Sequence, residues 1–387
     1  MNEPGIAELL SAAEQQTGLS HFGRDNFREG LEALVAGVNS SGLMIPGREP
    51  ALRRDLVRLL VNRLRWQKDL ADHPEINDQP LLPPLCIVSL PRTGTTKIQR
   101  FLAETTAFQD LQYWQILMPG RIHALPDHGV ERRIAETEAF CAWRVSVQPD
   151  IQKTHRITAL ESEEDIFLQE IGFRSKGLGF IHQSAHYHAW LAQQDISLSY
   201  DILRMQLQYL QWQFHGDHPM PWLLKSPVNL GMEDQLQRIF PAGMKVICPH
   251  REPAEIFPSL CRLVETYTGL YYNLPMRREE LGKFMLAGMA QGMLQHLQWR
   301  ERTRSVPILD LSFKEICADS IKVAEKIYDF IGIPFTSDAR KKITEWDARN
   351  PRYAEGRIEE DLETYGLSAR EVNAHFAQYR ERFSAYL

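Results

Sequence analysis

The chain has 387 residues, which is enough for one large domain or two medium-sized ones. Its hydrophobic fraction of 43% is ordinary for a globular protein. A formal net charge of −6 argues against a protein that binds nucleic acid through general positive charge. Any anionic ligand therefore has to be held by local, convergent cations.

Cysteine usage and apolar runs indicate the compartment. The five cysteines are scattered and form no CxxC pair: Cys86, Cys141, Cys248, Cys261 and Cys317. They predict buried thiols in a reducing environment. The polar start of the chain does not resemble a signal peptide, and no run of about 18 apolar residues occurs. We expect a cytoplasmic protein without a transmembrane segment.

Residues 1–80 predict a helical N-terminal extension. Within 51–70, five leucines recur at helical spacing on one face: Leu52, Leu56, Leu59, Leu60 and Leu64. The arginines fall mainly on the opposite face, which we interpret as a solvated basic face rather than an anion site.

A strand, a tight loop and a helix are predicted next. The apolar run Leu85–Leu90 stops at the loop 91–96, and a helix-compatible segment, Lys97–Glu104, follows at once. Proteins build phosphate cradles in this way, because the N–H groups and the dipole at a helix N-terminus favour an anion. An ordinary strand-turn-helix is the alternative.

The loop itself has the chemistry of an anion site. Arg92 and Lys97 bring positive charge, Thr95 and Thr96 bring hydroxyl donors, and Gly94 lets the backbone come close. The GxxxxGK[ST] pattern of nucleotide-hydrolysing loops is absent. The loop therefore fits an anion rather than a metal nucleotide.

The remaining chain predicts strands alternating with helices. The expected strands are Trp222–Lys225, Lys245–Pro249, Val306–Leu311 and Gly179–His182. The expected helices are Met232–Phe240, Ala254–Glu265, Gln291–Arg304 and Ser320–Ile331. This alternation predicts βαβ units and a parallel sheet. Residues 105–220 are mostly helix-prone and predict a helical insertion that covers the ligand site.

A second anion motif follows the predicted strand Lys245–Pro249. Arg251 lies just past the carboxyl end of that strand, where open α/β sheets bind ligands. Ser259 lies eight residues further on, inside the next helix. An arginine and a hydroxyl so placed can share one phosphate, unless Arg251 pairs with Glu252 or Glu255 instead.

The two motifs together resemble a known family. The loop 91–96 resembles the 5′-phosphosulfate loop of sulfotransferases that use 3′-phosphoadenosine 5′-phosphosulfate (PAPS), and Arg251–Pro253 with Ser259 resembles their 3′-phosphate motif. Segments 308–316, 365–368, 376–383 and 18–34 are similar to bacterial members as well. The resemblance implies an α/β fold: a P-loop-like parallel sheet flanked by helices over 81–387, packed as a single unit with the 1–80 extension.

The resemblance also implies an activity and a donor site. A sulfuryl group would pass from PAPS to a hydroxyl or amine of a small acceptor, without a metal ion. The residues implied to hold the donor are Arg92, Thr93, Gly94, Thr95, Thr96, Lys97, Arg251, Ser259 and Arg357, the last from a segment that could close over the nucleotide. Arg92 also counts among the expected catalytic residues, and Lys225 is expected to stabilise charge on the leaving oxygen.

The general base is the point of departure from the family. Many relatives carry a histidine where this chain has Asn229, and an amide cannot act as a base. The best substitute is His155, and a structural histidine is the alternative. We interpret Ser162 as a helix N-cap and Glu163, Glu164 and Asp165 as first-turn acids. Weaker candidates for the base are His182, His186 and His188.

Three functional hypotheses stay open at this point. The first is an active sulfotransferase; the second is a related nucleotide-binding protein with impaired catalysis, which Asn229 favours; the third is a P-loop kinase, which the missing GK[ST] disfavours. The aromatic residues within 186–214, with Tyr267, Tyr271 and Tyr272, hint at a hydrophobic acceptor, although aromatics fill cores first. The oligomeric state is left open, with a dimer as one option.

Overall fold

The computed structural model describes residues 5–216, 218–351, 356 and 360–387. At its centre lies a sheet of four parallel strands in the order β2-β1-β3-β4. The strands are β1 (Leu85–Ile87), β2 (Leu223–Lys225), β3 (Lys245–His250) and β4 (Ile308–Ser312). Each lies where a strand is predicted, so the parallel α/β sheet is confirmed. The chain adds β2 on one side of β1 and then β3 on the other, so the strand order reverses at β1, which is where such sheets bind ligands.

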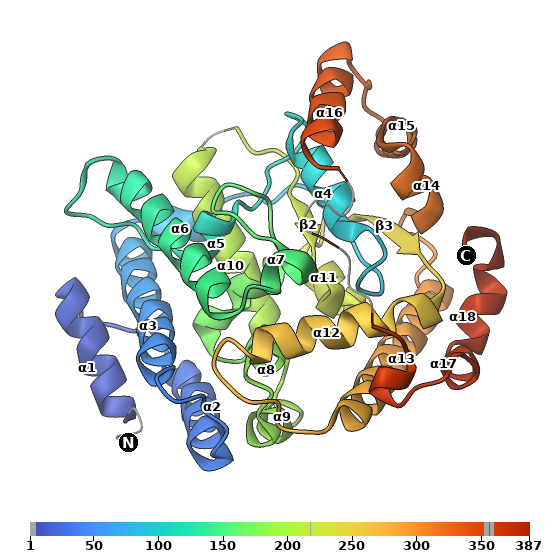
Figure 1. Cartoon of the computed structure of the whole chain (residues 1–387). Coiled ribbons are helices and arrows are strands. Elements are labelled where there is room, and N and C mark those ends of the chain that lie inside the picture. Colours follow the sequence, from blue (N-terminus) through green and yellow to red (C-terminus); the bar gives the residue numbers. More distant parts are fainter. Residues whose placement is uncertain (1–4, 217, 352–355, 357–359) are drawn as a thin grey trace.

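Helices surround the sheet. The helices within the described residues are α1 (Ile6–Thr17), α2 (Arg28–Ser41), α3 (Glu49–Asp72), α4 (Thr95–Ala103), α5 (Tyr113–Leu117), α6 (Val130–Val147), α7 (Ile151–His155), α8 (Lys176–His182), α9 (Ala185–Leu191), α10 (Ser197–Phe214), α11 (Glu233–Ile239), α12 (Phe257–Thr268), α13 (Arg278–Arg302), α14 (Phe313–Ala318), α15 (Ser320–Ile331), α16 (Ser337–Arg349), α17 (Ala369–His375) and α18 (Ala377–Arg382). In Figure 1 the blue N-terminal helices and the red C-terminal helices lie on opposite sides of the sheet. No helix in the described part of the chain has the length and apolarity to cross a membrane.

The N-terminal helices pack as the leucine spacing predicts. All five leucines of α3 are buried, and they share one apolar cluster with Leu178 of α8 and Tyr267 of α12. Arg63 departs from the predicted basic face: it is 2% exposed and donates to the carbonyls of Phe22, Arg24 and Ile171. Through these hydrogen bonds Arg63 connects the N-terminal helices to the helical insertion.

The helical insertion contains α5 to α10, and here one strand prediction is wrong. Gly179–His182 belongs to α8, whose N-cap is Ser175; the Ser175 hydroxyl accepts from the Gly177 N–H at 3.0 Å. A four-residue apolar run has no period that separates a strand from a buried helix turn. The N-cap at Ser175 and the packing against α12 stabilise the helical conformation of this segment.

All five cysteines are free, as the sequence predicts. Cys86, Cys248 and Cys261 are buried, whereas Cys141 and Cys317 are only partly buried. Burial raises the pKa of the Cys141 thiol to about 11.

Candidate functional site

The loop after β1 has a backbone that few side chains tolerate. Arg92 has φ of +65° and Gly94 has φ of +90°. A Cβ on Gly94 would lie 3.0 Å from Ile316 Cγ2, so α14 leaves no room for a larger residue. Thr93 is buried, and its hydroxyl donates to the Leu90 carbonyl at 2.8 Å. The Thr93 side chain therefore stabilises the loop, and α4 begins directly after Gly94.

The structure brings the two anion motifs into direct contact. Arg92 Nε donates to Ser259 Oγ at 2.9 Å, and Arg251 Nη1 donates to the Arg92 carbonyl at 3.0 Å. Burial and the neighbouring charge of Arg251 lower the pKa of Arg92. No described carboxylate forms an ion pair with Arg92. Two guanidinium groups close together, one of them without an ion pair among the described residues, fit a ligand with more than one anionic group.

The other loop cations have protein partners. Arg251 Nε donates to Glu255 at 3.1 Å, which is the pairing foreseen as an alternative, whereas Glu252 pairs with Arg380. Lys97 Nζ lies 3.5 Å from Asp347. Arg357, the remaining candidate for donor binding, lies outside the described residues.

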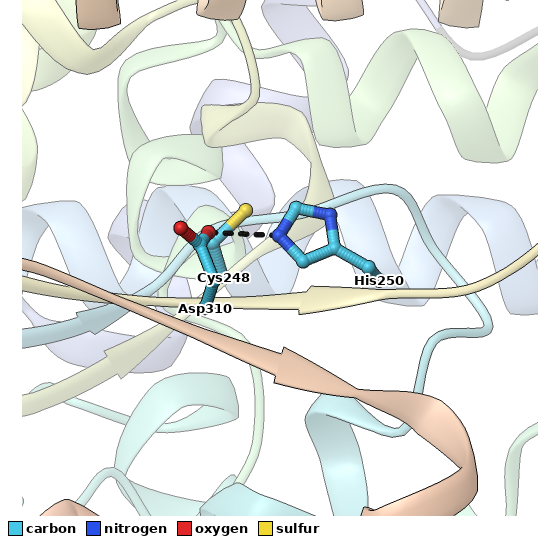
Figure 2. Close-up of side chains that lie close together, drawn as sticks. All are labelled: Cys248, His250 and Asp310. Atoms are coloured by element: carbon cyan, nitrogen blue, oxygen red, sulfur yellow. Dashed lines mark hydrogen bonds and ion pairs between the residues drawn. The ribbon is translucent and has the colours of Figure 1, made fainter. Parts of the chain in front are cut away.

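A second cluster of polar side chains connects the ends of β3 and β4 next to Arg251. His250 Nε2 lies 2.8 Å from Asp310 Oδ1 across β3 and β4, with Cys248 beside them (Figure 2). Arg300 donates to both Asp310 oxygens at 2.8 and 2.6 Å. Although burial raises the pKa of Asp310, the hydrogen bonds from His250 and Arg300 lower it to about 2. Asp310 is therefore ionised at neutral pH. It positions His250, and with His250 the backbone that leads to Arg251.

Lys225, at the end of β2, has an environment that the sequence analysis did not foresee. Its side chain is fully buried, with Nζ 2.8 Å from Glu164 and 3.5 Å from Glu163. The interpretation of Ser162 as an N-cap is wrong, since the 3-10 helix Asp165–Gly172 begins after Glu164 and no side chain caps it. Of the three expected first-turn acids, only Asp165 lies in the first turn. Ser162 instead forms a bridge with Gln112. A buried lysine needs an anionic partner, and the acids supply it.

His155 extends this group of charges toward α12. His155 Nε2 lies 3.1 Å from Glu163, and Nδ1 lies 2.8 Å from the Tyr267 hydroxyl. Burial alone would raise the pKa of Glu163. The charges of His155 and Lys225 have the larger effect and bring this pKa to well below its ordinary value. The result is a continuous polar chain, Lys225–Glu163–His155–Tyr267, that runs from the end of β2 to α12. Tyr267 was noted in the sequence only as an aromatic residue.

The other candidates for the base are not part of this polar chain. Asn229 donates to Asp165 at 3.1 Å and accepts from the Tyr200 hydroxyl at 2.9 Å, so it is bonded within the core. His182 bonds the Tyr272 hydroxyl, and burial lowers its pKa to about 4. His186 is exposed and His188 packs on the Phe284 ring. No described contact joins these histidines to Lys225.

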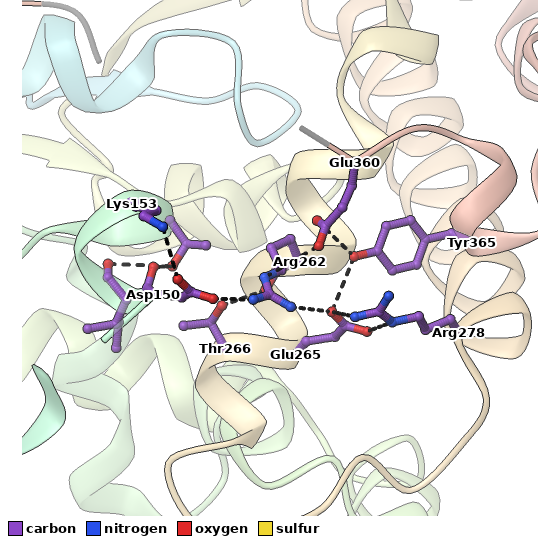
Figure 3. A network of polar contacts seen from close by, with 10 residues as sticks. Asp150, Lys153, Arg262, Glu265, Thr266, Arg278, Glu360 and Tyr365 are labelled. Atoms are coloured by element: carbon purple, nitrogen blue, oxygen red, sulfur yellow. Dashed lines mark hydrogen bonds and ion pairs between the residues drawn. The ribbon is translucent and has the colours of Figure 1, made fainter. Parts of the chain in front are cut away.

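A network of ion pairs fixes α12, which carries both Ser259 and Tyr267. Arg262 lies between Asp150 and Glu265 of the same helix, and Glu265 also accepts from Arg278 at 2.7 Å (Figure 3). Tyr365 donates to Glu265 at 3.2 Å. Since Asp150 directly precedes α7, the network holds α12 against the helix that ends in His155.

Comparisons with known proteins identify the fold and the family. The family model described as the sulfotransferase family matches residues 83–337. The sulfotransferase STF1 from Mycobacterium tuberculosis H37Rv superposes with a TM-score of 0.80 at 24% identity, over 97% of this chain and 99% of that one. The sulfotransferase STF9 from Mycobacterium avium gives 0.79 at 27% identity, over 98% and 96%. A comparison with curated proteins found no match. The match over two thirds of the chain shows that this protein belongs to the sulfotransferase family.

Proposed function

We propose that this protein transfers a sulfuryl group from PAPS to a hydroxyl or amine of a small acceptor. The observation that carries the proposal is the direct contact between the two anion motifs, Arg92 with Ser259 and Arg251 with the Arg92 backbone. A nucleotide with phosphates at its 5′ and 3′ ends requires two cationic groups that are near each other and separately anchored. A metal-dependent kinase lacks support, because the loop has no lysine at the GK[ST] position.

In this proposal the loop holds the 5′-phosphosulfate end of the donor. The N-terminus of the nine-residue helix α4 offers the N–H groups of Thr95, Thr96 and Lys97, and Arg92 adds a half-buried charge. Arg251 and Ser259 take the 3′-phosphate. On binding, Arg251 exchanges Glu255, which is largely exposed, for the phosphate.

The reaction forms a bond between the acceptor oxygen or nitrogen and sulfur, and breaks the bond between sulfur and the bridging oxygen of the donor. Lys225 donates a hydrogen bond to that bridging oxygen, which leaves with the electron pair as part of adenosine 3′,5′-bisphosphate. Glu163 and Glu164 lie beside Lys225 Nζ, at 3.5 and 2.8 Å, and are its anionic partners in a buried place.

His155 takes the proton of the acceptor by way of Tyr267. The Tyr267 oxygen accepts the acceptor proton while its own proton passes to His155 Nδ1, and Glu163 stabilises the imidazolium that forms. The orientation of an imidazole between a carboxylate and a hydroxyl supports this role.

The donor half is tested by isothermal titration with adenosine 3′,5′-bisphosphate. We expect binding without added metal, and an absence of binding at millimolar ligand would refute the proposal. His155→Ala should keep this affinity and lower turnover by about 10²–10⁴-fold. Normal turnover of His155→Ala would refute the base assignment. Binding of the bisphosphate without sulfation of any acceptor would favour the impaired protein, which Asn229 suggests.

We further propose that residues 81–387 form the catalytic unit, with 1–80 as a helical extension packed on it in a cytoplasmic protein. The apolar cluster shared by α1–α3, α8 and α12 supports the single packed unit. The free thiols are consistent with a reducing compartment.

A further inference from the structure

A cavity of about 50 Å³ lies next to the polar chain that ends at Tyr267. It is lined by residues of α3, α5, α6, α8, α12 and the 3-10 helix Asp165–Gly172, with Tyr267 in its wall. The aromatic residues of 186–214 do not line it. Tyr187, Tyr200 and Tyr209 among them are instead buried in the core. The space beside Tyr267 is where the acceptor must place the group that reacts.

The walls of the cavity are mostly apolar, but its lining includes one carboxyl group without a partner. Glu170 is 5% exposed, and its Oε1 is buried with no hydrogen-bond partner among the described residues. Nearby Asp55, by contrast, bonds the Tyr271 hydroxyl and Arg54 and lies 4.0 Å from Arg58. An unpaired buried polar atom is costly, so a native structure that keeps one has a reason for it.

The protonation state of Glu170 defines the chemistry it offers. Burial raises the pKa of Glu170 to about 8; Arg58 lowers it and Asp55 raises it further. The neutral carboxyl has one O–H donor and one carbonyl acceptor. A hydroxyl group, which also donates and accepts, satisfies both at once.

The size of the cavity limits the body of the ligand. A cavity that holds benzene in a rigid apolar core has a volume of about 150 Å³, which is three times the volume found beside Tyr267. A narrow alkyl chain fits such a space better than an aromatic ring does.

We propose that this cavity is the acceptor site and that Glu170 selects aliphatic alcohols with a second hydroxyl at the end remote from the reacting one. The inference rests on the proposed sulfuryl transfer and names its acceptor class. The reacting hydroxyl lies at Tyr267, the alkyl chain contacts the apolar walls, and the second hydroxyl exchanges hydrogen bonds with Glu170.

The test compares α,ω-alkanediols of two to four carbons with 1-alkanols of equal length, each with PAPS and the full-length protein. We expect kcat/KM for the best diol to exceed that for its matched alkanol by about tenfold or more, since the alkanol leaves Glu170 unpaired. In Glu170→Leu this preference should fall to about one. Glu170→Gln, which keeps donor and acceptor groups, should retain most of it. Glu8→Leu, a matched change at an exposed glutamate of α1, should leave the ratio as in the wild type.

Each other outcome overturns the inference. An equal preference in wild type and Glu170→Leu would remove Glu170 from acceptor recognition. A preference for ω-amino alcohols would assign an ionised carboxylate, and a preference for phenols would reject the aliphatic class. Titration with adenosine 3′,5′-bisphosphate separates the two levels: binding with a failed diol preference refutes only this inference, whereas absence of binding refutes the sulfotransferase proposal beneath it. If Glu170→Leu does not fold, the wild-type ratio and Glu170→Gln still decide.

Discussion

Replacing Glu170 by glutamine removes a buried ionisable group and keeps its size, so the pH dependence of stability reports on that group alone. Glu170 faces Arg58 and Asp55 in the cavity, and burial is the largest influence on its pKa. The folded-state pKa is raised above the unfolded value, which means that the folded protein binds this proton more tightly. The free energy of unfolding must then fall as pH rises from the unfolded pKa toward the folded one.

The magnitude follows from the shift. The pKa rises from 4.5 to about 8, and each unit corresponds to about 1.4 kcal/mol. The wild type should therefore lose on the order of 4 kcal/mol relative to Glu170→Gln between pH 4.5 and 8. Above pH 8 the difference should level off, because Glu170 is then ionised in both states.

Urea unfolding followed by tryptophan fluorescence at pH 5, 6, 7 and 8 measures this difference. Glu8→Gln, at an exposed glutamate of α1, serves as the control and should follow the wild type at every pH. A stability difference between wild type and Glu170→Gln that is the same at pH 5 and pH 8 would refute the reasoning. It would show that Glu170 already has an ionic partner in the folded protein.

Three further predictions concern the donor loop and α12. Arg251→Ala should weaken binding of adenosine 3′,5′-bisphosphate by about 2–3 kcal/mol in isothermal titration, and an unchanged Kd would exclude Arg251 from the donor site. Tyr267→Phe should lower kcat by about 10²–10⁴-fold with the bisphosphate Kd unchanged; an unaltered kcat would reject proton transfer through Tyr267. Gly94→Ala should destabilise the protein by about 1–2 kcal/mol in thermal unfolding and weaken donor binding, because φ is +90° and Ile316 is 3.0 Å away. Gly288→Ala, a helical glycine with open space around it, should be neutral or stabilising, and equal effects at both positions would contradict the steric argument.

The sequence predicts the framework of this molecule well, because its strands are short, mainly apolar runs, of which β1 to β3 are almost wholly buried and β4 is partly buried. The runs at Leu85, Leu223, Lys245 and Ile308 stand out for that reason, and the loop glycine and arginines that follow them are local signals. The family and the α/β fold are confirmed by the match over 83–337 and by the solved structures. The roles of the loop residues stay predictions.

The acidic and aromatic partners could not be predicted, because their meaning depends on contacts across long separations. Glu163 and Glu164 look like helix-capping acids in sequence, yet they lie beside Lys225, about 60 residues away in the chain. Tyr267 and Glu170 carry no local signal at all. A buried lysine at a strand end is the one hint that could have found the acids, since such a charge requires a partner.

Helix α12 fixes the distance between two residues of the candidate site. Ser259 and Tyr267 are both on α12, eight residues apart, which corresponds to about 12 Å along a helix axis. The ion pairs at Arg262 and Glu265 keep that helix from sliding. In the proposed reaction, the rise of this helix therefore sets the distance between the group that binds the nucleotide and the group that meets the acceptor. Inserting one residue between these positions would turn Tyr267 by about 100° away from His155 without altering a single side chain that touches either substrate.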